Sequence, residues 1–179
     1  MKIFDEIPHI ENDRLVLGRI TADDSAGLLE MTGDSEVYRY LPTFLFEKKY
    51  DDIHIVTERI YSENFAAGES VLLGIYPRDT GKFCGIAEIY GVNDAIHKVS
   101  IGYRLLRRFW GQGIATQAVA ALVDYIYSRT DTQIITTSTM VENKASARVL
   151  EKNGFIMTAS SVDEDWGYEK MTRADKWFR

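Results

Sequence analysis

The chain has 179 residues, of which 45% are hydrophobic and 27% are charged, with 13 glycines and 3 prolines, the balance of a globular domain. Its net charge of −6 disfavours nucleic acid and anionic membrane surfaces as partners, because both carry dense negative charge. No apolar run approaches the roughly twenty residues that a membrane-spanning helix needs.

The single cysteine, Cys84, excludes an internal disulfide, and the chain has no CxxC or His-rich pattern, so we expect no metal site. Residues 1–13 lack the cationic start and the small-residue cleavage site of a secretory signal. No linker or repeat divides the sequence. We therefore expect one domain over residues 1–179 in a reducing cytoplasm.

Local patterns up to residue 106 predict two strands, three helices and a hairpin. Thr21 and Asp24 have the spacing of an approximate capping box, which opens a helix. The loop 77–81 is bounded by Pro and Gly and joins two β-rich runs, which is typical of a hairpin. The expected elements are a strand over 14–20, helices over 21–31, 35–41 and 51–65, hairpin strands over 71–76 and 82–90, and a strand over 98–106.

The second half alternates helices with strands, which indicates an α/β fold. The strand, turn, helix and strand over 98–141 form the unit that a crossover between parallel strands requires, whereas the hairpin must be antiparallel. The sheet should therefore be mixed. The expected elements here are a helix over 113–128, a strand over 133–141, a helix over 143–153, and strands over 155–160 and 168–172 separated by an acidic turn at 163–165.

The most informative segment lies between a predicted strand and a predicted helix. Gly111 and Gly113 let the backbone approach a ligand closely, and the helix that follows adds its positive end, so this loop is suited to phosphate. Arg104, Arg107 and Arg108 add guanidinium groups in a chain that is otherwise acidic. A tight turn beside a solvated charged face fits the same spacing, so both interpretations stay open on spacing alone.

Two other phosphate-binding loops do not fit this segment. A Walker loop needs Lys and then Ser or Thr after its last glycine, whereas Gly113 is followed by Ile114 and Ala115. A dinucleotide fingerprint needs a third glycine where Thr116 stands, and it needs a first strand earlier in the chain. Nucleoside triphosphate hydrolysis and dinucleotide chemistry therefore lose support.

Four motifs in chain order resemble the GNAT acetyltransferases. They are Asp13-Arg14-Leu15-Val16-Leu17, Ile101-Gly102-Tyr103, Arg108-x-x-Gly111-x-Gly113 and Asn143-x-x-Ser146-x-x-Val149-Leu150-Glu151-Lys152-x-Gly154-Phe155. The resemblance covers nearly the whole chain and is similar to the branch of ribosomal-protein N-terminal acetyltransferases called the RimJ/RimL type. It implies the GNAT fold, a mixed α/β sheet of six or seven strands flanked by helices, and acetyl-CoA as the acyl donor.

The resemblance also implies where acetyl-CoA binds. The pantetheine arm pairs with the strand edge near Leu105 and Leu106, where a backbone N–H polarises the thioester carbonyl. Asn143 holds the pantetheine and Ser146 lies near the sulfur as a candidate proton relay, while a helix cap at Asn143 is compatible with both roles. The pyrophosphate loop comprises Arg107, Arg108, Trp110, Gly111, Gln112, Gly113, Ile114, Ala115 and Thr116.

Two departures from the family pattern leave the catalytic acid and base open. Leu150 stands where many relatives have a Tyr acid, and Ser100 stands where many have an acidic residue. Glu88 interrupts an apolar strand, so its charge must face solvent or a polar cleft. We favour Glu164 or Asp165 as the base, although solvated loop acids are commoner. The full set of base candidates is Glu88, His97, Asp163, Glu164 and Asp165.

The expected activity is transfer of an acetyl group from acetyl-CoA to a primary amine by direct attack. A lysine-like ammonium, with a pKa near ~10.4, must first lose a proton, which needs a base. A small-molecule amine and a protein N-terminus both fit as acceptors, and a monomer and a homodimer both fit as assemblies. The alternatives are a non-catalytic acyl-CoA-binding module, motivated by Leu150 and Ser100, and a nucleotide-binding protein.

Overall fold

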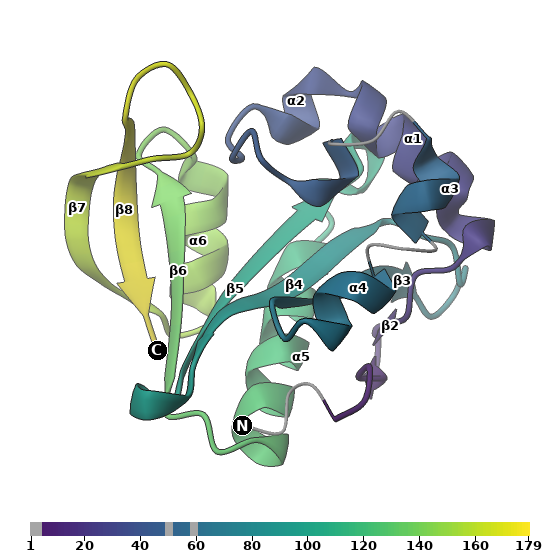
Figure 1. Cartoon of the computed structure of the whole chain (residues 1–179), viewed down its shortest axis with the longest axis horizontal. Coiled ribbons are helices and arrows are strands. Elements are labelled where there is room, and N and C mark those ends of the chain that lie inside the picture. Colours follow the sequence, from purple (N-terminus) through teal and green to yellow (C-terminus); the bar gives the residue numbers. More distant parts are fainter. Residues whose placement is uncertain (1–4, 49–51, 58–60) are drawn as a thin grey trace.

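Eight strands form one mixed sheet in the part of the chain that the computed structural model describes, residues 5–48, 52–57 and 61–179. In space they follow the order β1-β2-β3-β4-β5-β6-β8-β7 (Figure 1), and neighbours are antiparallel except for the parallel pair β5 and β6. The expected mixed α/β sheet is confirmed, with eight strands instead of six or seven. The strands are β1 (Ile10–Glu11), β2 (Leu15–Gly18), β3 (Ser70–Pro77), β4 (Gly85–Asn93), β5 (Lys98–Leu105), β6 (Ile134–Met140), β7 (Ile156–Glu164) and β8 (Thr172–Phe178).

Helices pack against both faces of this sheet (Figure 1). On one face, Ala118 and Leu122 of α5 join a buried cluster with Val99 and Ile101 of β5. On the other face, a second cluster joins helix α1 to β4 through residues such as Ile86. The helices are α1 (Ser25–Gly33), α2 (Ser35–Tyr38), α3 (Ile53–Ile55), α4 (Tyr61–Ala66), α5 (Ile114–Arg129) and α6 (Lys144–Lys152), with short 3-10 turns at Ala22–Asp24, Phe46–Lys48, Asp94–Ile96 and Arg107–Phe109.

Several local predictions are confirmed. Strands β3 and β4 pair as the expected antiparallel hairpin, and helix α5 connects β5 to the parallel strand β6. The Thr21 backbone N–H donates to Asp24 Oδ2 over 2.8 Å, as a capping box requires. These elements have strong apolar periodicity or a turn rich in Pro and Gly, so local sequence determines them.

Other local predictions are wrong or incomplete. Of the helix expected over 51–65, the structure describes the helical segments α3 and α4, whereas residues 51 and 58–60 of that range lie outside the described residues. The last strand begins at Thr172 instead of covering 168–172, and β7 continues through Asp163 and Glu164, where a turn was expected. Strand β7 lies at the sheet edge with its residues mostly exposed, so charged side chains are compatible with it. Strand β1 has only two residues, too few for a periodic signal.

Strands β5 and β6 separate along their length, and this separation positions the candidate site. They pair only between residues 98–100 and 134–136. Beyond that point β5 continues toward Leu105 and β6 toward Met140, and the two strands diverge in Figure 1. The divergence leaves an unpaired strand edge on β5, next to the loop that the sequence analysis singled out.

No helix among the described residues combines the length and the apolar character needed to cross a bilayer.

Candidate active site

The unpaired edge of β5 presents backbone groups of Tyr103 and Leu105 to the gap between β5 and β6. In the antiparallel ladder between β4 and β5, Leu106 N–H donates to Cys84 O over 2.9 Å. Antiparallel pairs alternate between bonded and non-bonded positions, so the groups of residues 103 and 105 point away from β4. Of the two N–H groups expected to polarise a carbonyl, that of Leu106 is already bound, and that of Leu105 faces the gap.

One carbonyl oxygen on this strand edge, that of Leu105, already accepts a hydrogen bond within the protein. The indole N–H of Trp110 donates to the Leu105 carbonyl oxygen over 2.9 Å. The Trp110 side chain therefore folds back from the loop onto the end of β5, although 45% of the residue remains exposed. This contact fixes the loop relative to the strand edge.

The loop after β5 has the backbone conformation that an anion site requires. Gly111 has φ +72° and Gly113 has φ +77°, a region that favours glycine. A Cβ built on Gly111 meets nothing within 4 Å, so the space in front of the loop is open. The first helical bond of α5 runs from Gln117 N to Gly113 O, which leaves the N–H groups of residues 114–116 outside the helical ladder. Free N–H groups at a helix N-terminus suit a diphosphate, so the loop fits the group that the sequence predicts.

The arginines beside the loop are arranged differently from the expectation. Arg104 is buried and points to the opposite face of the sheet, so its predicted place at the phosphate loop is wrong. Arg107 Nε lies 3.1 Å from Asp34 Oδ2, and Arg108 forms an ion pair with Glu30. The Arg107 side chain is 62% exposed and the Arg108 side chain is 50% exposed.

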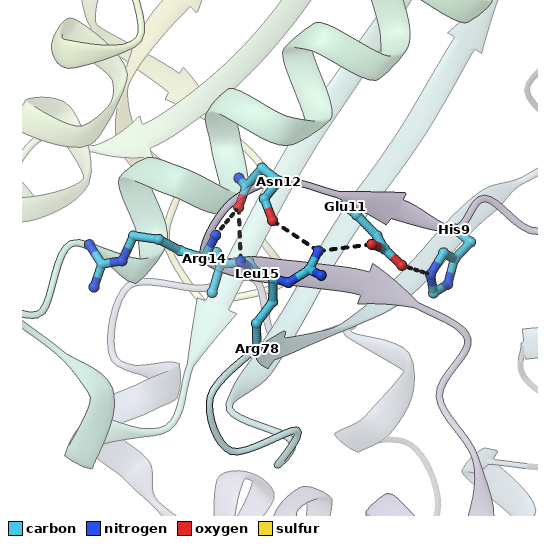
Figure 2. Close-up of polar contacts among 6 residues, drawn as sticks. All are labelled: His9, Glu11, Asn12, Arg14, Leu15 and Arg78. Atoms are coloured by element: carbon cyan, nitrogen blue, oxygen red, sulfur yellow. Dashed lines mark hydrogen bonds and ion pairs between the residues drawn. The ribbon is translucent and has the colours of Figure 1, made fainter.

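Arg14 supplies a cation at the loop that sequence reasoning did not assign to it. Its Nη1 lies 3.8 Å from the position a Cβ on Gly113 would take. Figure 2 shows the Arg14 side chain extending away from the contacts that join His9, Glu11 and Arg78. No carboxylate among residues 5–48, 52–57 and 61–179 forms an ion pair with Arg14. The signal in the sequence was its place in the Asp13-Arg14-Leu15 motif.

The other wall of the gap is the N-terminus of α6. Asn143 caps this helix, because its Oδ1 accepts from the Ser146 backbone N–H over 3.1 Å. The Tyr103 hydroxyl, from β5, donates to Ser146 Oγ over 3.1 Å. Burial raises the pKa of Tyr103 and the bond to Ser146 lowers it, and the balance is a raised pKa. The two hydroxyl groups therefore join the two walls of the gap.

The face of β4 and β5 that lies opposite α5 carries a buried charge cluster. Arg104 donates from Nη1 to Glu88 Oε2 over 3.1 Å and from Nη2 to Glu47 Oε2 over 2.8 Å. Its Nε also pairs with Glu47, and the Tyr38 hydroxyl donates to Glu47 Oε1 over 3.1 Å. Two buried carboxylates therefore share one guanidinium. Burial raises the pKa of Glu88, Arg104 lowers it and Glu47 raises it, with a net pKa above the usual range.

The acids at the end of β7 have other partners. Glu164 Oε2 lies 2.5 Å from Lys176 Nζ. The Glu164 residue and Tyr90 also line a cavity of about 310 Å³ over β5 and β6. Burial raises the pKa of Glu164, but its hydrogen bond to Lys176 and further polar contacts give a net lowered pKa. Asp165 is exposed and accepts from Gly167 N over 2.8 Å, which is a turn contact.

The remaining base candidates lie away from the gap. His97 lies just before the paired end of β5, and its Nδ1 is 3.1 Å from Asp131 Oδ2. Asp163 is exposed and pairs with Arg173.

A larger cavity, about 630 Å³, lies between residues 5–12 and α5, away from every predicted site residue. Cys84 is fully buried, and burial raises the pKa of its thiol to about 12, so it is not a nucleophile.

Residues 14–156 match the family model described as the acetyltransferase (GNAT) domain. The chain is 26% identical over 148 residues to an uncharacterised N-acetyltransferase, YoaA, of Bacillus subtilis (strain 168), covering 83% of this chain and 82% of that protein. Its fold is similar to RimL, a ribosomal L7/L12 alpha-N-protein acetyltransferase, with a TM-score of 0.78, 18% identity, and coverage of 97% of this chain and 92% of that one. It is also similar to spermidine N-acetyltransferase from Vibrio cholerae in complex with CoA and spermine, with a TM-score of 0.77, 15% identity, and coverage of 94% and 96%. The expected fold and family resemblance are confirmed.

Proposed function

The chain belongs to the GNAT family of acetyltransferases, and we propose that it transfers the acetyl group of acetyl-CoA to a primary amine by direct attack. The observation that carries the proposal is the gap between β5 and β6. A loop with free N–H groups lies at its mouth, an unpaired strand edge forms one wall, and the capped N-terminus of α6 forms the other.

Acetyl-CoA would be held by backbone groups more than by side chains. The diphosphate would take the N–H groups of residues 111–116, with Arg14 adding charge. The pantetheine arm would pair with the exposed edge of β5, and the Asn143 amide group would contact it from α6. When bound, acetyl-CoA supplies a thioester, an acyl group already activated toward amines.

Glu88 is the group we propose as the general base. Its raised pKa and its single contact with Arg104 make it a better proton acceptor than Glu164, whose pKa is lowered by its contact with Lys176. The amine nitrogen forms the new C–N bond with its lone pair, and Glu88 takes the proton that the nitrogen loses, directly or through water. The C–S bond breaks and the sulfur keeps the electron pair.

Leu105 is the group we propose for carbonyl polarisation. Its N–H points into the gap, where it can donate to the oxygen that gains negative charge during attack. A backbone donor is already oriented, so it needs little rearrangement during the reaction. Leu106 does not serve this role, because its N–H is bound to Cys84.

The charges around Glu88 favour a cationic acceptor. Two buried carboxylates against one guanidinium leave an excess of negative charge on this face. Burial raises the pKa of Tyr90, and the negative charges of Glu88 and Glu164 raise it further. Tyr90 and Glu164 line the same cavity, and a Cβ built on Gly102 would lie 3.7 Å from Tyr90 Cε1 and 4.0 Å from Glu88 Oε2. A protein N-terminus, an amino-sugar antibiotic and a polyamine all carry the ammonium group that such a surface attracts.

The test compares ligands and then acceptors. Acetyl-CoA should raise the melting temperature, whereas ATP and NAD should not, because ligand binding to the folded state shifts unfolding by mass action. A panel of amines should then release CoA thiol. Protection by acetyl-CoA without thiol release from any amine would favour a non-catalytic acyl-CoA-binding module, and protection by ATP alone would favour a nucleotide-binding protein.

A further inference from the structure

A cavity of about 310 Å³ lies over β5 and β6 at the point where these strands begin to diverge (Figure 1). Ile135 of β6 packs toward α5, so strand alternation turns its neighbour Thr136 to the opposite face of the sheet, where the cavity lies. Val99 and Ser100 are related in the same way on β5. The volume is near the lower end of the range for small-molecule sites, about 300–1,000 Å³.

Four side chains form a straight row across this cavity, one from each of four neighbouring strands. Tyr90 of β4 is paired with Ser100 of β5. Thr136 of β6 is paired with Ser100 on one side and with Phe178 of β8 on the other. All four residues line the cavity. Neighbouring strands lie about 4.8 Å apart, so the two strands that carry the aromatic rings are about 14 Å apart, with two hydroxyl groups between them.

The hydroxyl groups of this row keep hydrogen-bonding capacity for a ligand. Ser100 Oγ and Thr136 Oγ1 are 2.8 Å apart, and Thr136 Oγ1 also donates to the Val99 carbonyl oxygen over 3.3 Å. Each hydroxyl oxygen has two lone pairs and one proton, so these contacts leave acceptor positions unused. Ser138, which also lines the cavity, accepts from Lys176 Nζ over 3.1 Å and keeps its own proton to donate. The wall therefore offers both donors and acceptors.

The charges that line the cavity disfavour an acceptor with several ammonium groups. Among the described residues of this wall, Glu164 is the one carboxylate, while Lys98 and Lys176 are cationic. Lys176 Nζ lies 2.5 Å from Glu164 Oε2, so the charge of that carboxylate is already neutralised. A polyamine needs a carboxylate for each further ammonium group, and this wall repels such groups instead.

Glu88 lies next to the row and provides the place for the reacting amine. It precedes Tyr90 by two residues on β4 and is paired with Gly102 of β5. A Cβ built on Gly102 would lie 3.7 Å from Tyr90 Cε1 and 4.0 Å from Glu88 Oε2. The glycine therefore leaves room for a small group between the proposed base and the row. An amine in that space has the rest of its molecule over the cavity.

The row is also a poor site for a polypeptide acceptor. A peptide that binds to a sheet commonly adds to an unpaired strand edge. Residues 98–100 and 134–136 are paired with each other at the row, so their backbone groups are not available to a further strand. Only side chains remain for recognition there.

We propose that this cavity binds a hydroxylated cyclic amine of the amino-sugar class, with its primary amine beside Glu88. This inference rests on the proposed function. An amino sugar has one amine, a ring of hydroxyl groups that exchange hydrogen bonds with Ser100, Thr136 and Ser138, and C–H faces that pack on aromatic rings. Its nitrogen forms the new C–N bond, Glu88 takes the proton that the nitrogen loses, and the electron pair of the C–S bond stays with the sulfur. The products are an N-acetylated sugar and CoA.

The test compares acceptors that share a six-membered ring and one amine. Glucosamine and its isomers with the amine at another ring carbon carry hydroxyl groups, whereas cyclohexylamine does not. For the wild type, kcat/KM for the best amino sugar should exceed that for cyclohexylamine, spermidine and a peptide with a free N-terminus by about tenfold or more, as two or more hydrogen bonds would provide.

Thr136→Val removes one hydroxyl group of the row and keeps the shape of the side chain. It should lower kcat/KM for the best amino sugar by about threefold to tenfold, the effect of one hydrogen bond, and change that for cyclohexylamine by less than about twofold. Comparing each acceptor between variant and wild type cancels the different basicities of the amines. Titration calorimetry of the amino sugar into the CoA complex should show the same loss of affinity without turnover.

Two further variants complete the test. Thr80→Val is the matched control, because the Thr80 hydroxyl accepts from Lys82 N–H over 3.4 Å in the distant β3–β4 hairpin turn. It should leave both acceptors unchanged. Ser100→Ala removes the other hydroxyl group of the row and replaces Thr136→Val if that variant does not fold.

The outcomes separate this inference from the proposed function. Preference for an amino sugar, with a loss in Thr136→Val that is confined to that acceptor, supports the inference. Preference for spermidine or the peptide, or a Thr136→Val effect that is absent or equal for both ring amines, overturns the assignment of the cavity and leaves the proposed function intact. No release of CoA thiol with any amine overturns the proposed function itself.

Discussion

Glu88 accepts a single hydrogen bond from Arg104, 3.1 Å from Nη1 to Oε2, while the rest of that guanidinium is bound by Glu47. The bidentate contact with Glu47 satisfies most of the charge of Arg104, so Glu88 is only partly neutralised. A carboxylate in this position, buried and with excess negative charge beside it, is well suited to accept a proton.

Glu88→Gln should lower kcat with the best amine by about a hundredfold to ten-thousandfold, the usual contribution of a general base. The amide has nearly the same shape as the carboxylate but cannot take the proton. Acetyl-CoA binding, measured by thermal shift, should be unchanged, because Glu88 makes none of the contacts proposed for the diphosphate, the pantetheine arm or the thioester carbonyl. Glu164→Gln is the comparison, and it should raise KM more than it lowers kcat. The opposite pattern would assign the base to Glu164.

Glu47→Gln should move the acidic limb of the kcat/KM profile to lower pH by about half a unit to one unit. The negative charge of Glu47 raises the pKa of Glu88, so its removal lets Glu88 ionise at lower pH. Glu36→Gln is the matched control, since Glu36 pairs with Arg39 at 3.3 Å on the exposed surface of α2. An acidic limb that stays in place in Glu47→Gln would argue against Glu88 as the titrating group.

Gly111→Val should abolish the thermal shift caused by acetyl-CoA. The valine cannot adopt φ +72° without strain, and its side chain would occupy the open space in front of the loop. Gly81→Val is the control, because Gly81 has φ +62°, also has nothing within 4 Å of a built Cβ, and lies in the distant β3–β4 hairpin loop. Both variants should lose about 1 kcal/mol of stability, and an equal ligand response in both folded variants would reject the loop assignment.

Arg14→Gln should weaken acetyl-CoA binding by about threefold to tenfold, with a smaller salt dependence, because one cation near a phosphate is removed. Arg78→Gln provides the contrast. Arg78 Nη1 donates to Glu11 Oε2 over 2.8 Å and belongs to the contact group in Figure 2 that holds β1. Titration calorimetry at two salt concentrations measures both variants. Equal affinities for the wild type and Arg14→Gln would remove Arg14 from the site.

Sequence alone predicted the parts of the fold that depend on local pattern. The β3–β4 hairpin follows from β-rich runs around a turn at 77–81, and the loop at Gly111 and Gly113 follows from residues that permit positive φ. The boundary between β7 and β8 could not be predicted in this way. An edge strand with exposed residues has no apolar alternation to distinguish it from a loop.

The contacts within the site depend on side-chain direction and on pairs of residues far apart in the chain. Arg104 was expected beside the phosphate loop, but strand alternation turns it to the other face, where Glu47 and Glu88 bind it. The contact between Tyr103 and Ser146 spans a sheet gap that exists only after β5 and β6 diverge. Neither arrangement has a signal in residue spacing.

The most direct test of the account is a crystal structure of the protein with acetyl-CoA. We expect a diphosphate on the N–H groups of residues 111–116, a pantetheine arm paired with the β5 edge at Tyr103 and Leu105, and a sulfur within hydrogen-bond distance of Ser146 Oγ. Density for the donor in another place, with the 111–116 loop free of it, would contradict the account.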